Sequence, residues 1–416
     1  MLGIIDENGI SEERLGSALH SYFGGKYRHA LIIPPDYTRL HSGAGTITRL
    51  LMGLEGTKGS VMPALGTHEP MTREQCLDFF GGSVDYDSLI VHNWRTGVER
   101  VGVVPAEYVS RVSEGLVCEP IDVELSKELL KPCYDMIISV GQVVPHEVVG
   151  MANYSKNIFV GCGGTSMISA SHMLGAFYGL ERIMGETDTP VRAVFDYAQE
   201  KYLSSLPLEY VLTVTGCGSD GETKIFGLFI GRDRQVFEHA ALLSRRKNVT
   251  YLDRRPKKIV VYLDGREFKS TWLGNKAVYR TRRAIADGGE LVVLAPGVSK
   301  FGEDPLNDEL IREYGYTGRE RILQLVKENT RLAQNLSVAA HLIHGSSDGR
   351  FRITYCTPLM QPGELEQAGY GWAPYEREAE KYAGLSDGFN VVDGEEVYYI
   401  SNPALGLWIY DGKTEE

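Results

Sequence analysis

Two histidines and a lysine lie close together in HEVVGMANYSKNIFVGCGGTSMISASHMLG, residues 146–175. Lys156 follows His146 by 10 positions, and His172 follows Lys156 by 16. The stretch contains neither the HExxH motif of zinc proteases nor a GxxxxGK[ST] phosphate loop. Imidazoles act as acids, bases and metal ligands, and an amine can hold a ligand covalently. These residue types indicate a reactive centre more strongly together than any of them does alone.

Reactive side chains also follow apolar segments that we expect to form strands. LIIPP leads into 36–39 (Asp-Tyr-Thr-Arg), VMPALG into His68, MIISVGQVV into His146, and NIFVG into the glycine turn at 161–164. Ligands of open α/β sheets bind beyond the carboxyl ends of the strands, so these segments predict one shared site. Each member also has a simpler explanation on its own: an aspartate can cap a helix, and a lysine can be a solvated surface amine.

Apolar segments alternate with amphipathic ones along the chain, which predicts an α/β fold with largely parallel sheets. The expected strands include SLIVHNW, NIFVGCG and SVAAHLIHG, and the expected helices include KAVYRTRRAIADGG. Basic and polar residues gather with a proline at 244–258, just before a strong strand. We therefore expect two α/β domains, residues 1–252 and 253–416, with the active site in the cleft between them.

The composition excludes several classes of protein. The formal net charge of −12 argues against broad binding to nucleic acid or to an anionic membrane. No apolar run is long enough to span a membrane, and the first residues do not resemble a signal peptide. The six cysteines are scattered without a CxxC pair, which predicts reduced, mostly buried thiols and a cytoplasmic location.

The combined motifs resemble those of the lactate racemase family, whose members use a nickel-pincer nucleotide. The matching segments are DYTR at 36–39, ALGTH at 64–68, VVPHEVVGMANYSK at 143–156 and SASHMLG at 169–175. The resemblance extends weakly through KAVYRTRRAIADGGELVVLAPG at 276–297 and so covers most of the chain. It implies an isomerase, a racemase or epimerase that inverts C2 of a 2-hydroxy acid.

The resemblance also implies a role for each candidate residue. The cofactor is pyridinium-3,5-bisthiocarboxylic acid mononucleotide nickel, attached covalently through Lys156, and His172 would be its protein ligand to nickel. His68 and His146 would be the catalytic acid/base pair. The N-terminal domain would bind the cofactor, with Asp36, Thr38 and Arg39 near the nucleotide phosphate. The C-terminal domain would close over the substrate, which Lys276, Trp272 and Arg95 would contact.

These residue types suit the implied chemistry. The C2 hydrogen of a hydroxy carboxylate is barely acidic, so it leaves more easily as hydride, which a pyridinium ring accepts. The hydroxyl proton must leave as well, and histidine suits acid and base duty at neutral pH. Return of the hydride to the other face of the flat keto acid inverts C2. A further imidazole suits nickel, and a guanidinium binds phosphate.

Departures from the family pattern point away from lactate. The family has a Ser-Gly-Gly-like stretch before the lysine, where this chain has Ala-Asn-Tyr-Ser at 152–155. A Tyr-Gln pair of lactate racemase is replaced by Trp272-Leu273. A lost amide and a gained indole favour a larger polar acid, such as an aldonate, and gluconate 2-epimerisation is our example. The expected partners are this small acid and the proteins that make and load the cofactor; the oligomeric state is not predicted.

Two alternative functions remain open at this stage. An NAD-dependent 2-hydroxy acid dehydrogenase would need a GxGxxG turn after a strand with an acid about 20 residues on, and we find none. A non-catalytic protein that binds a sugar acid or the cofactor would need no acid/base pair, so the presence of both His68 and His146 argues against it.

Overall fold

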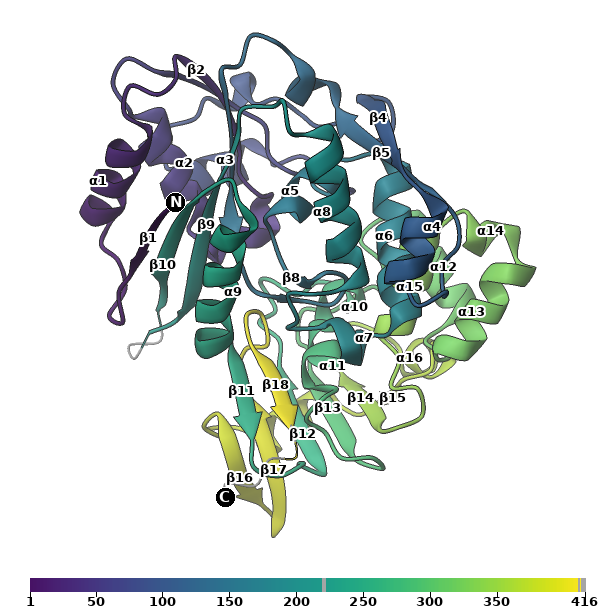
Figure 1. Ribbon diagram of the computed structural model, residues 1–416. Coiled ribbons are helices and arrows are strands. Elements are labelled where there is room, and N and C mark those ends of the chain that lie inside the picture. The colour runs from purple at the N-terminus through teal and green to yellow at the C-terminus, as the bar shows by residue number, and fades with distance from the viewer. Residues whose placement is uncertain (219–221, 411, 413–416) are drawn as a thin grey trace. The chain divides into compact units, whose positions relative to one another are not determined.

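The computed structural model describes residues 1–218, 222–410 and 412 and divides the chain into two compact units (Figure 1). Unit 1 comprises Met1–Leu174 and Ile183–Asn248, and unit 2 comprises Gly175–Arg182 and Val249–Glu416. Helices α6 (Thr165–Tyr178) and α7 (Leu180–Ile183) lie where the chain passes between the units. The functional division at 252 and the interdomain location of the active site stay predictions.

Unit 1 is built on a six-stranded sheet in which the three pairings β3–β2, β2–β6 and β6–β9 are parallel. Strands β10 and β1 extend it by antiparallel pairing. In sheet order the strands are β1 (Leu2–Ile5), β10 (Thr223–Gly231), β9 (Leu208–Cys217), β6 (Met136–Gln142), β2 (His29–Ile33) and β3 (Lys58–Val61). The carboxyl ends of β2, β3, β6 and β9 therefore lie at the same edge.

Both faces of this sheet are buried, because successive residues of its strands point to opposite sides. Ala30 and Ile32 pack with α1 (Glu12–Phe23), α2 (Ala44–Met52) and α3 (Arg73–Phe80). Leu31 and Ile33 pack on the other face with three different helices: α5 (Ser155–Phe159), α8 (Pro190–Tyr202) and α9 (Arg234–Asn248). Figure 1 shows α1 and α9 on opposite sides of the sheet. This burial explains the nearly continuous apolar strands.

Smaller elements complete unit 1. Two antiparallel ribbons pair β4 with β5 and β7 with β8. The ribbons and the remaining helical elements are β4 (Val98–Val104), β5 (Ile121–Ser126), β7 (Pro145–His146), β8 (Gly150–Met151), α4 (Ala106–Val112), and the 3₁₀ turns η1 (Tyr37–Ser42), η2 (Tyr86–Ser88) and η3 (Lys127–Leu130).

Unit 2 contains a second six-stranded sheet, parallel except for the pairing of β16 with β17. Its order is β15 (Gly371–Trp372), β14 (Arg352–Cys356), β13 (Glu290–Leu294), β12 (Lys258–Tyr262), β17 (Glu395–Ile400) and β16 (Gly388–Val392). Strands β11 (Val249–Leu252) and β18 (Leu407–Tyr410) form a separate parallel pair. The expected α/β fold with largely parallel sheets is confirmed in both units.

The helices of unit 2 are mostly short. Buried apolar residues of its central strands, such as Val260, Val292 and Val397, form part of its core. The helices are α10 (Thr271–Gly274), α11 (Lys276–Thr281), α12 (Pro305–Tyr314), α13 (Arg319–Glu328), α14 (Thr330–Ala333), α15 (Leu336–His344), α16 (Pro362–Gln367) and α17 (Tyr375–Lys381).

Several expected elements were wrong. NIFVGCG begins in helix α5 instead of a strand, and SVAAHLIHG forms helix α15. SLIVHNW (88–94) contains no strand, and the helix expected over 276–289 ends at Thr281. A short run that is apolar on every side looks the same in a buried strand and in a buried helix, so hydrophobic periodicity cannot separate the two.

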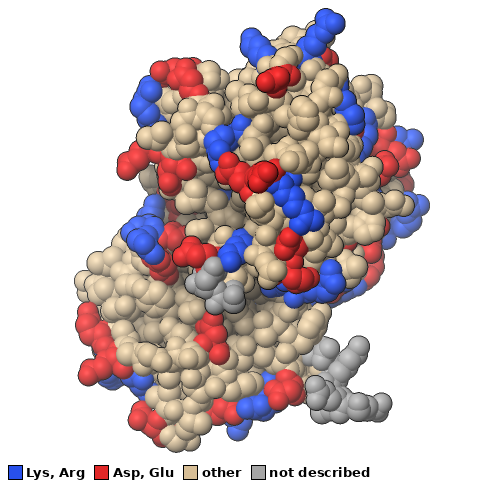
Figure 2. Space-filling model, turned by 90° about the vertical axis from the view of Figure 1, so that its left-hand side faces the viewer, with Lys and Arg blue, Asp and Glu red and all other residues tan. Residues whose placement is uncertain are grey.

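The surface and the cysteines add three observations. All six cysteines are free, but Cys118, Cys133 and Cys217 are exposed, so the expectation of mostly buried thiols was wrong. In the part of the chain that the structure describes, no helix combines the length and apolarity that a membrane crossing requires. The cytoplasmic location stays a prediction. On the face drawn in Figure 2, acidic and basic side chains are interspersed in small groups.

Candidate active site

Asp36 lies just beyond β2 and has two partners. Its backbone is extended at the start of η1, and its Oδ1 accepts a hydrogen bond of 2.8 Å from the Thr38 amide, as a helix-capping aspartate does. Its Oδ2 lies 3.2 Å from Nδ1 of His68. Burial by itself would raise the pKa of Asp36, but the neighbouring His68 and Arg39 outweigh burial and leave this pKa well below its usual value. Asp36 is therefore a buried carboxylate that orients an imidazole.

His68 reaches Asp36 because the loops after β2 and β3 run side by side. The Ala64 amide donates a 2.8 Å hydrogen bond to the Pro34 carbonyl, and the His68 amide closes a turn onto the Leu65 carbonyl at 2.9 Å. With Nδ1 turned to the carboxylate, the tautomer that suits this contact carries its proton on Nδ1 and leaves the Nε2 lone pair open. The ring is partly exposed.

His146 lies in β7, a short strand that follows the end of β6. The ring is buried, and its Nδ1 accepts a 3.1 Å hydrogen bond from the Val148 amide. The Glu147 carboxylate also lies 3.6 Å from this nitrogen. Burial lowers the pKa of His146 well below its ordinary value, the positive charge of Lys156 lowers it further, and Glu147 opposes both. In this geometry the neutral ring carries its proton on Nε2.

Lys156 lies in the first turn of α5, which the sheet holds in place. The Asn157 amide group donates to the Ile33 carbonyl at 3.2 Å and is 2.9 Å from the Ser139 hydroxyl, so α5 is tied to the ends of β2 and β6. Burial, together with the charge of Arg39, lowers the pKa of Lys156 from 10.5 to about 8. The amine is thus partly deprotonated, and nucleophilic, near neutral pH.

His172 lies within helix α6, and the helix itself orients the ring. Its Nδ1 lies 2.7 Å from the carbonyl oxygen of Ile168, four residues earlier. A carbonyl only accepts, so Nδ1 carries the proton and Nε2 keeps its lone pair free, the arrangement common among metal-bound histidines. Burial lowers the pKa of His172 and so favours this neutral, ligating form.

The turn before α6 is built by Glu124 of β5. Its Oε2 accepts a 2.9 Å hydrogen bond from the Ser166 amide in the first turn of the helix. A side chain on Gly164 would place Cβ 2.3 Å from the same Oε2, so only glycine fits there. The GCGGTS segment therefore serves close packing at the start of the helix that carries His172.

The predicted unit 1 residues act on one another electrostatically. The charges of Lys156, Arg39 and His172 each lower the pKa of His146, and His68 acts on His172. The Arg39 guanidinium donates to the Thr38 hydroxyl at 2.8 Å, and Thr38 itself is exposed. The structure thus brings Asp36, Thr38, Arg39, His68, His146, Lys156 and His172 into one cluster, the imidazole cluster.

One residue that acts on this cluster, Glu147, was not predicted from the sequence. The negative charge of Glu147 raises the pKa values of His146, Lys156 and His172. Its position next to His146 was the available signal, but an acid beside a histidine in sequence need not face it in the fold.

The three residues predicted to contact the substrate each have their own neighbours. In unit 2, Lys276 Nζ lies 3.4 Å from Glu267, and the Trp272 ring stacks on His341 with centroids 4.1 Å apart. In unit 1, Arg95 is exposed and lies over the Trp94 ring, with its guanidinium carbon 3.9 Å from the centroid. Their roles toward a substrate stay predictions.

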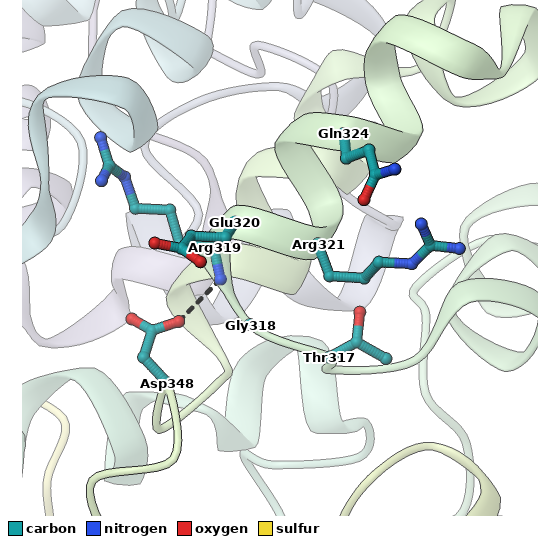
Figure 3. Close-up of a pocket in the computed structure, with 7 residues that line it drawn as sticks. All are labelled: Thr317, Gly318, Arg319, Glu320, Arg321, Gln324 and Asp348. Atoms are coloured by element: carbon teal, nitrogen blue, oxygen red, sulfur yellow. Dashed lines mark hydrogen bonds between the residues drawn. The ribbon is translucent and has the colours of Figure 1, made fainter.

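A groove of about 660 Å³ lies in unit 2 at the start of α13 (Figure 3). The Asp348 carboxylate accepts a 2.7 Å hydrogen bond from the Arg319 amide there and so satisfies the first turn of the helix. The lining residues are Thr317, Gly318, Arg319, Glu320, Arg321, Gln324 and Asp348, none of which the sequence analysis predicted. Among the described residues, no group of three His, Cys, Asp or Glu side chains is arranged to hold a metal ion.

Comparison with known proteins gives a match in the N-terminal part. A sequence model described as the lactate racemase N-terminal domain matches residues 12–182. Residues 12–182 are therefore similar to the N-terminal domain of lactate racemases. The resemblance expected from the sequence is thereby confirmed, and this segment contains the whole imidazole cluster. Such a relationship suggests a racemase or epimerase of 2-hydroxy acids.

Solved structures share the fold over nearly the whole chain. A crystal structure of a protein from Thermotoga maritima matches with a TM-score of 0.83 and 22% identity, covering 97% of this chain and 99% of that one. The lactate racemase apoprotein from Thermoanaerobacterium thermosaccharolyticum matches with a TM-score of 0.69 and 16% identity, covering 96% and 93%. No curated protein matches the chain in sequence.

Proposed function

We propose that this protein is a 2-hydroxy acid racemase or epimerase that holds a nickel-pincer nucleotide through Lys156. One observation carries the proposal: a lysine with a pKa of about 8 and a histidine with its Nε2 lone pair free belong to the same cluster. The lysine suits a covalent anchor, because only a deprotonated amine forms an amide-like bond. The histidine suits a borderline metal such as nickel.

The imidazole cluster fits such a group. His172 has a free lone pair on Nε2 that can bind a metal. The neutral His146 ring instead carries its proton on Nε2, and His68 is paired with a carboxylate. We therefore assign metal ligation to His172 alone. When bound, the cofactor supplies a hydride acceptor and donor at C2, and the protein residues supply the proton transfers.

Two imidazole–carboxylate pairs would carry those proton transfers. His68 would take the hydroxyl proton through Nε2, while Asp36 at 3.2 Å stabilises the resulting imidazolium. His146 would return a proton to the keto oxygen from Nε2 as the doubly protonated imidazolium and become neutral in doing so, while Glu147, 3.6 Å from Nδ1, stabilises that imidazolium. In the reverse direction the two histidines exchange roles. This assignment gives Asp36 an orienting role in place of the phosphate contact expected from the sequence.

The cationic side chains are the groups that could bind the phosphate of the cofactor and the carboxylate of the substrate. Arg39 contacts the Thr38 hydroxyl and carbonyl, and it keeps further donors for a phosphate or a substrate carboxylate. We propose the phosphate for Arg39 and Thr38, and an aldonate such as gluconate as the substrate, with Lys276, Trp272 and Arg95 on the substrate side.

The test is a measurement on protein purified from its native host. Intact mass should exceed the sequence mass by one cofactor, with one nickel per chain. A single enantiomer of a C2-deuterated 2-hydroxy acid should then invert with its deuterium retained. A protein without adduct or nickel would refute the cofactor assignment, and loss of the deuterium to solvent would refute hydride transfer.

A further inference from the structure

The backbone just before Lys156 is held in a conformation that side chains disfavour. Asn153 has a φ of 61° and Tyr154 has a φ of 55° with ψ of −133°. Glycine adopts such angles freely, and asparagine visits positive φ more readily than most residues, but any side chain adds strain, and a bulky one such as that of Tyr154 adds the most. Such strain persists only where surrounding contacts enforce it. Something in the fold must therefore hold residues 153 and 154 against their own preference.

Arg192 of α8 makes the contacts that can do so. Its guanidinium donates to the Met151 carbonyl at 2.7 Å, to the Asn153 carbonyl at 3.3 Å from both terminal nitrogens, and to the Ser155 hydroxyl at 2.7 Å. Its planar fork thus spans every second residue from 151 to 155. A point-like ammonium could not reach all three acceptors at once.

This arginine is unusual in its surroundings. It is fully buried, its guanidinium carbon lies 4.3 Å from the centroid of the Phe237 ring, and burial lowers its pKa to about 10. The Asp196 carboxylate, one turn further along α8, partly offsets burial by raising the pKa of Arg192, while the hydrogen bonds of the guanidinium go to neutral oxygens, those of the Met151 and Asn153 carbonyls and the Ser155 hydroxyl.

The rest of α8 supports the same segment. The Thr189 hydroxyl caps the helix by accepting from the Arg192 amide at 3.1 Å and also donates to the Val149 carbonyl at 3.2 Å. The Tyr154 hydroxyl accepts a 2.7 Å hydrogen bond from the side chain of Gln199, which lies about two turns after Arg192 in the same helix. Helix α8 and its cap Thr189 therefore form hydrogen bonds along the chain from Val149 to Ser155, directly before Lys156.

We propose that Arg192 is a positioning residue for Lys156. Its guanidinium holds residues 151–155 in the strained path that aims the Lys156 amine into the imidazole cluster. In a chain that lacks glycine at 153 and 154, this clamp replaces glycine's conformational freedom. The role of the amine as an anchor rests on the proposed function, but the clamp on its backbone does not.

The experiment measures the reactivity of the Lys156 amine in full-length protein made without cofactor. The protein is acetylated with trace acetic anhydride, and peptide mass spectrometry gives the rate at Lys156 relative to exposed Lys201. Arg192→Lys keeps the charge and removes the fork. Arg232→Lys is the matched control, because Arg232 also donates to backbone carbonyls, those of Leu203, Ser204 and Leu206.

The proposal expects Arg192→Lys to slow acetylation of Lys156 by about 10-fold or more, because an amine displaced from the imidazole cluster regains an ordinary pKa and is almost wholly protonated at neutral pH. Arg232→Lys should leave the rate unchanged. Adding Asn153→Gly to Arg192→Lys should restore most of the rate, because glycine accepts the positive φ without a clamp. An unchanged rate in Arg192→Lys, or a loss that glycine at 153 does not reverse, would overturn the proposal.

Ser155→Ala keeps the test decisive if Arg192→Lys does not fold, because it removes one acceptor and leaves the guanidinium in place. The rate at Lys156 should then fall by a smaller factor, and an unchanged rate again overturns the proposal. Failure of the proposed function is seen separately, as native protein without adduct or nickel whose Lys156 reactivity still depends on Arg192.

Discussion

The carbonyl oxygen of Ile168 lies 2.7 Å from Nδ1 of His172, one turn further along helix α6. The hydrogen bond is internal to the helix, so it holds the ring without help from any other element. It also distinguishes His172 from His146, whose Nδ1 accepts a hydrogen bond instead. The two imidazoles therefore present opposite groups at Nε2, a lone pair in one and a proton in the other.

This contrast predicts how nickel retention responds to single substitutions. His172→Ala should lose most of the nickel, since its Nε2 is the lone pair available to the metal, while His146→Ala should retain it. Metal analysis of each variant purified from the native host gives the ratio of nickel to protein. His20→Ala, on the exposed face of α1, is the control. Nickel loss in His146→Ala and retention in His172→Ala would reverse the assignment.

The Lys156 amine should react at a lower pH than an ordinary lysine. Its pKa is lowered from 10.5 to about 8, so half of the amines are deprotonated at pH 8. Only the deprotonated form attacks a carbonyl, so the rate of acylation should rise with pH and reach half its maximum near 8. Competitive acetylation of cofactor-free protein across pH 6–11, read by mass spectrometry, measures this midpoint. A midpoint near 10.5 would contradict the lowered pKa.

The two histidines that we propose as the acid/base pair should each have a large effect on the rate. His68→Ala and His146→Ala should each lower the racemisation rate by about 10²–10⁴-fold, the usual contribution of a general acid or base. Asp36→Asn and Glu147→Gln should cost less, because an amide still fills the space but stabilises the imidazolium poorly. Chiral chromatography of the product gives the initial rates on cofactor-loaded enzyme. If Glu147→Gln keeps the full rate in both directions, Glu147 has no part in proton transfer.

Trp272 should affect a polyol acid more than a small one. Its indole is half-buried and stacks on His341, with ring centroids 4.1 Å apart, which fixes the orientation of the ring. Trp272→Ala should raise KM for gluconate by about 2- to 12-fold, the effect of losing an aromatic contact of about 0.5–1.5 kcal/mol. KM for lactate should change little. A panel of single-enantiomer hydroxy acids measures both, and turnover of lactate as fast as of gluconate would rule out the aldonate.

Sequence reasoning found the members of the imidazole cluster because their chemistry and spacing are local properties. It also predicted the parallel sheets, since strands buried on both faces are apolar throughout. It failed where tertiary contacts decide: NIFVG looked like a strand but forms α5, which Asn157 ties to the sheet through Ile33 and Ser139. Arg192 and Glu147 were missed because neither belongs to a motif, and only the fold brings Arg192 to a segment about 40 residues earlier.

The positive φ angles at Asn153 and Tyr154 also constrain the order in which this protein can change over evolution. Loss of Arg192 is harmful while residue 153 carries a side chain, and it becomes tolerable once glycine stands at 153. Glycine at 153, by contrast, can be accepted first, whereas glycine at 154 would remove a buried ring that stacks on Phe237. Sequences that share this site should therefore combine an arginine at 192 with a side chain at 153, or glycine at 153 with a free choice at 192. A lineage that has lost both is expected to have lost the anchored amine as well.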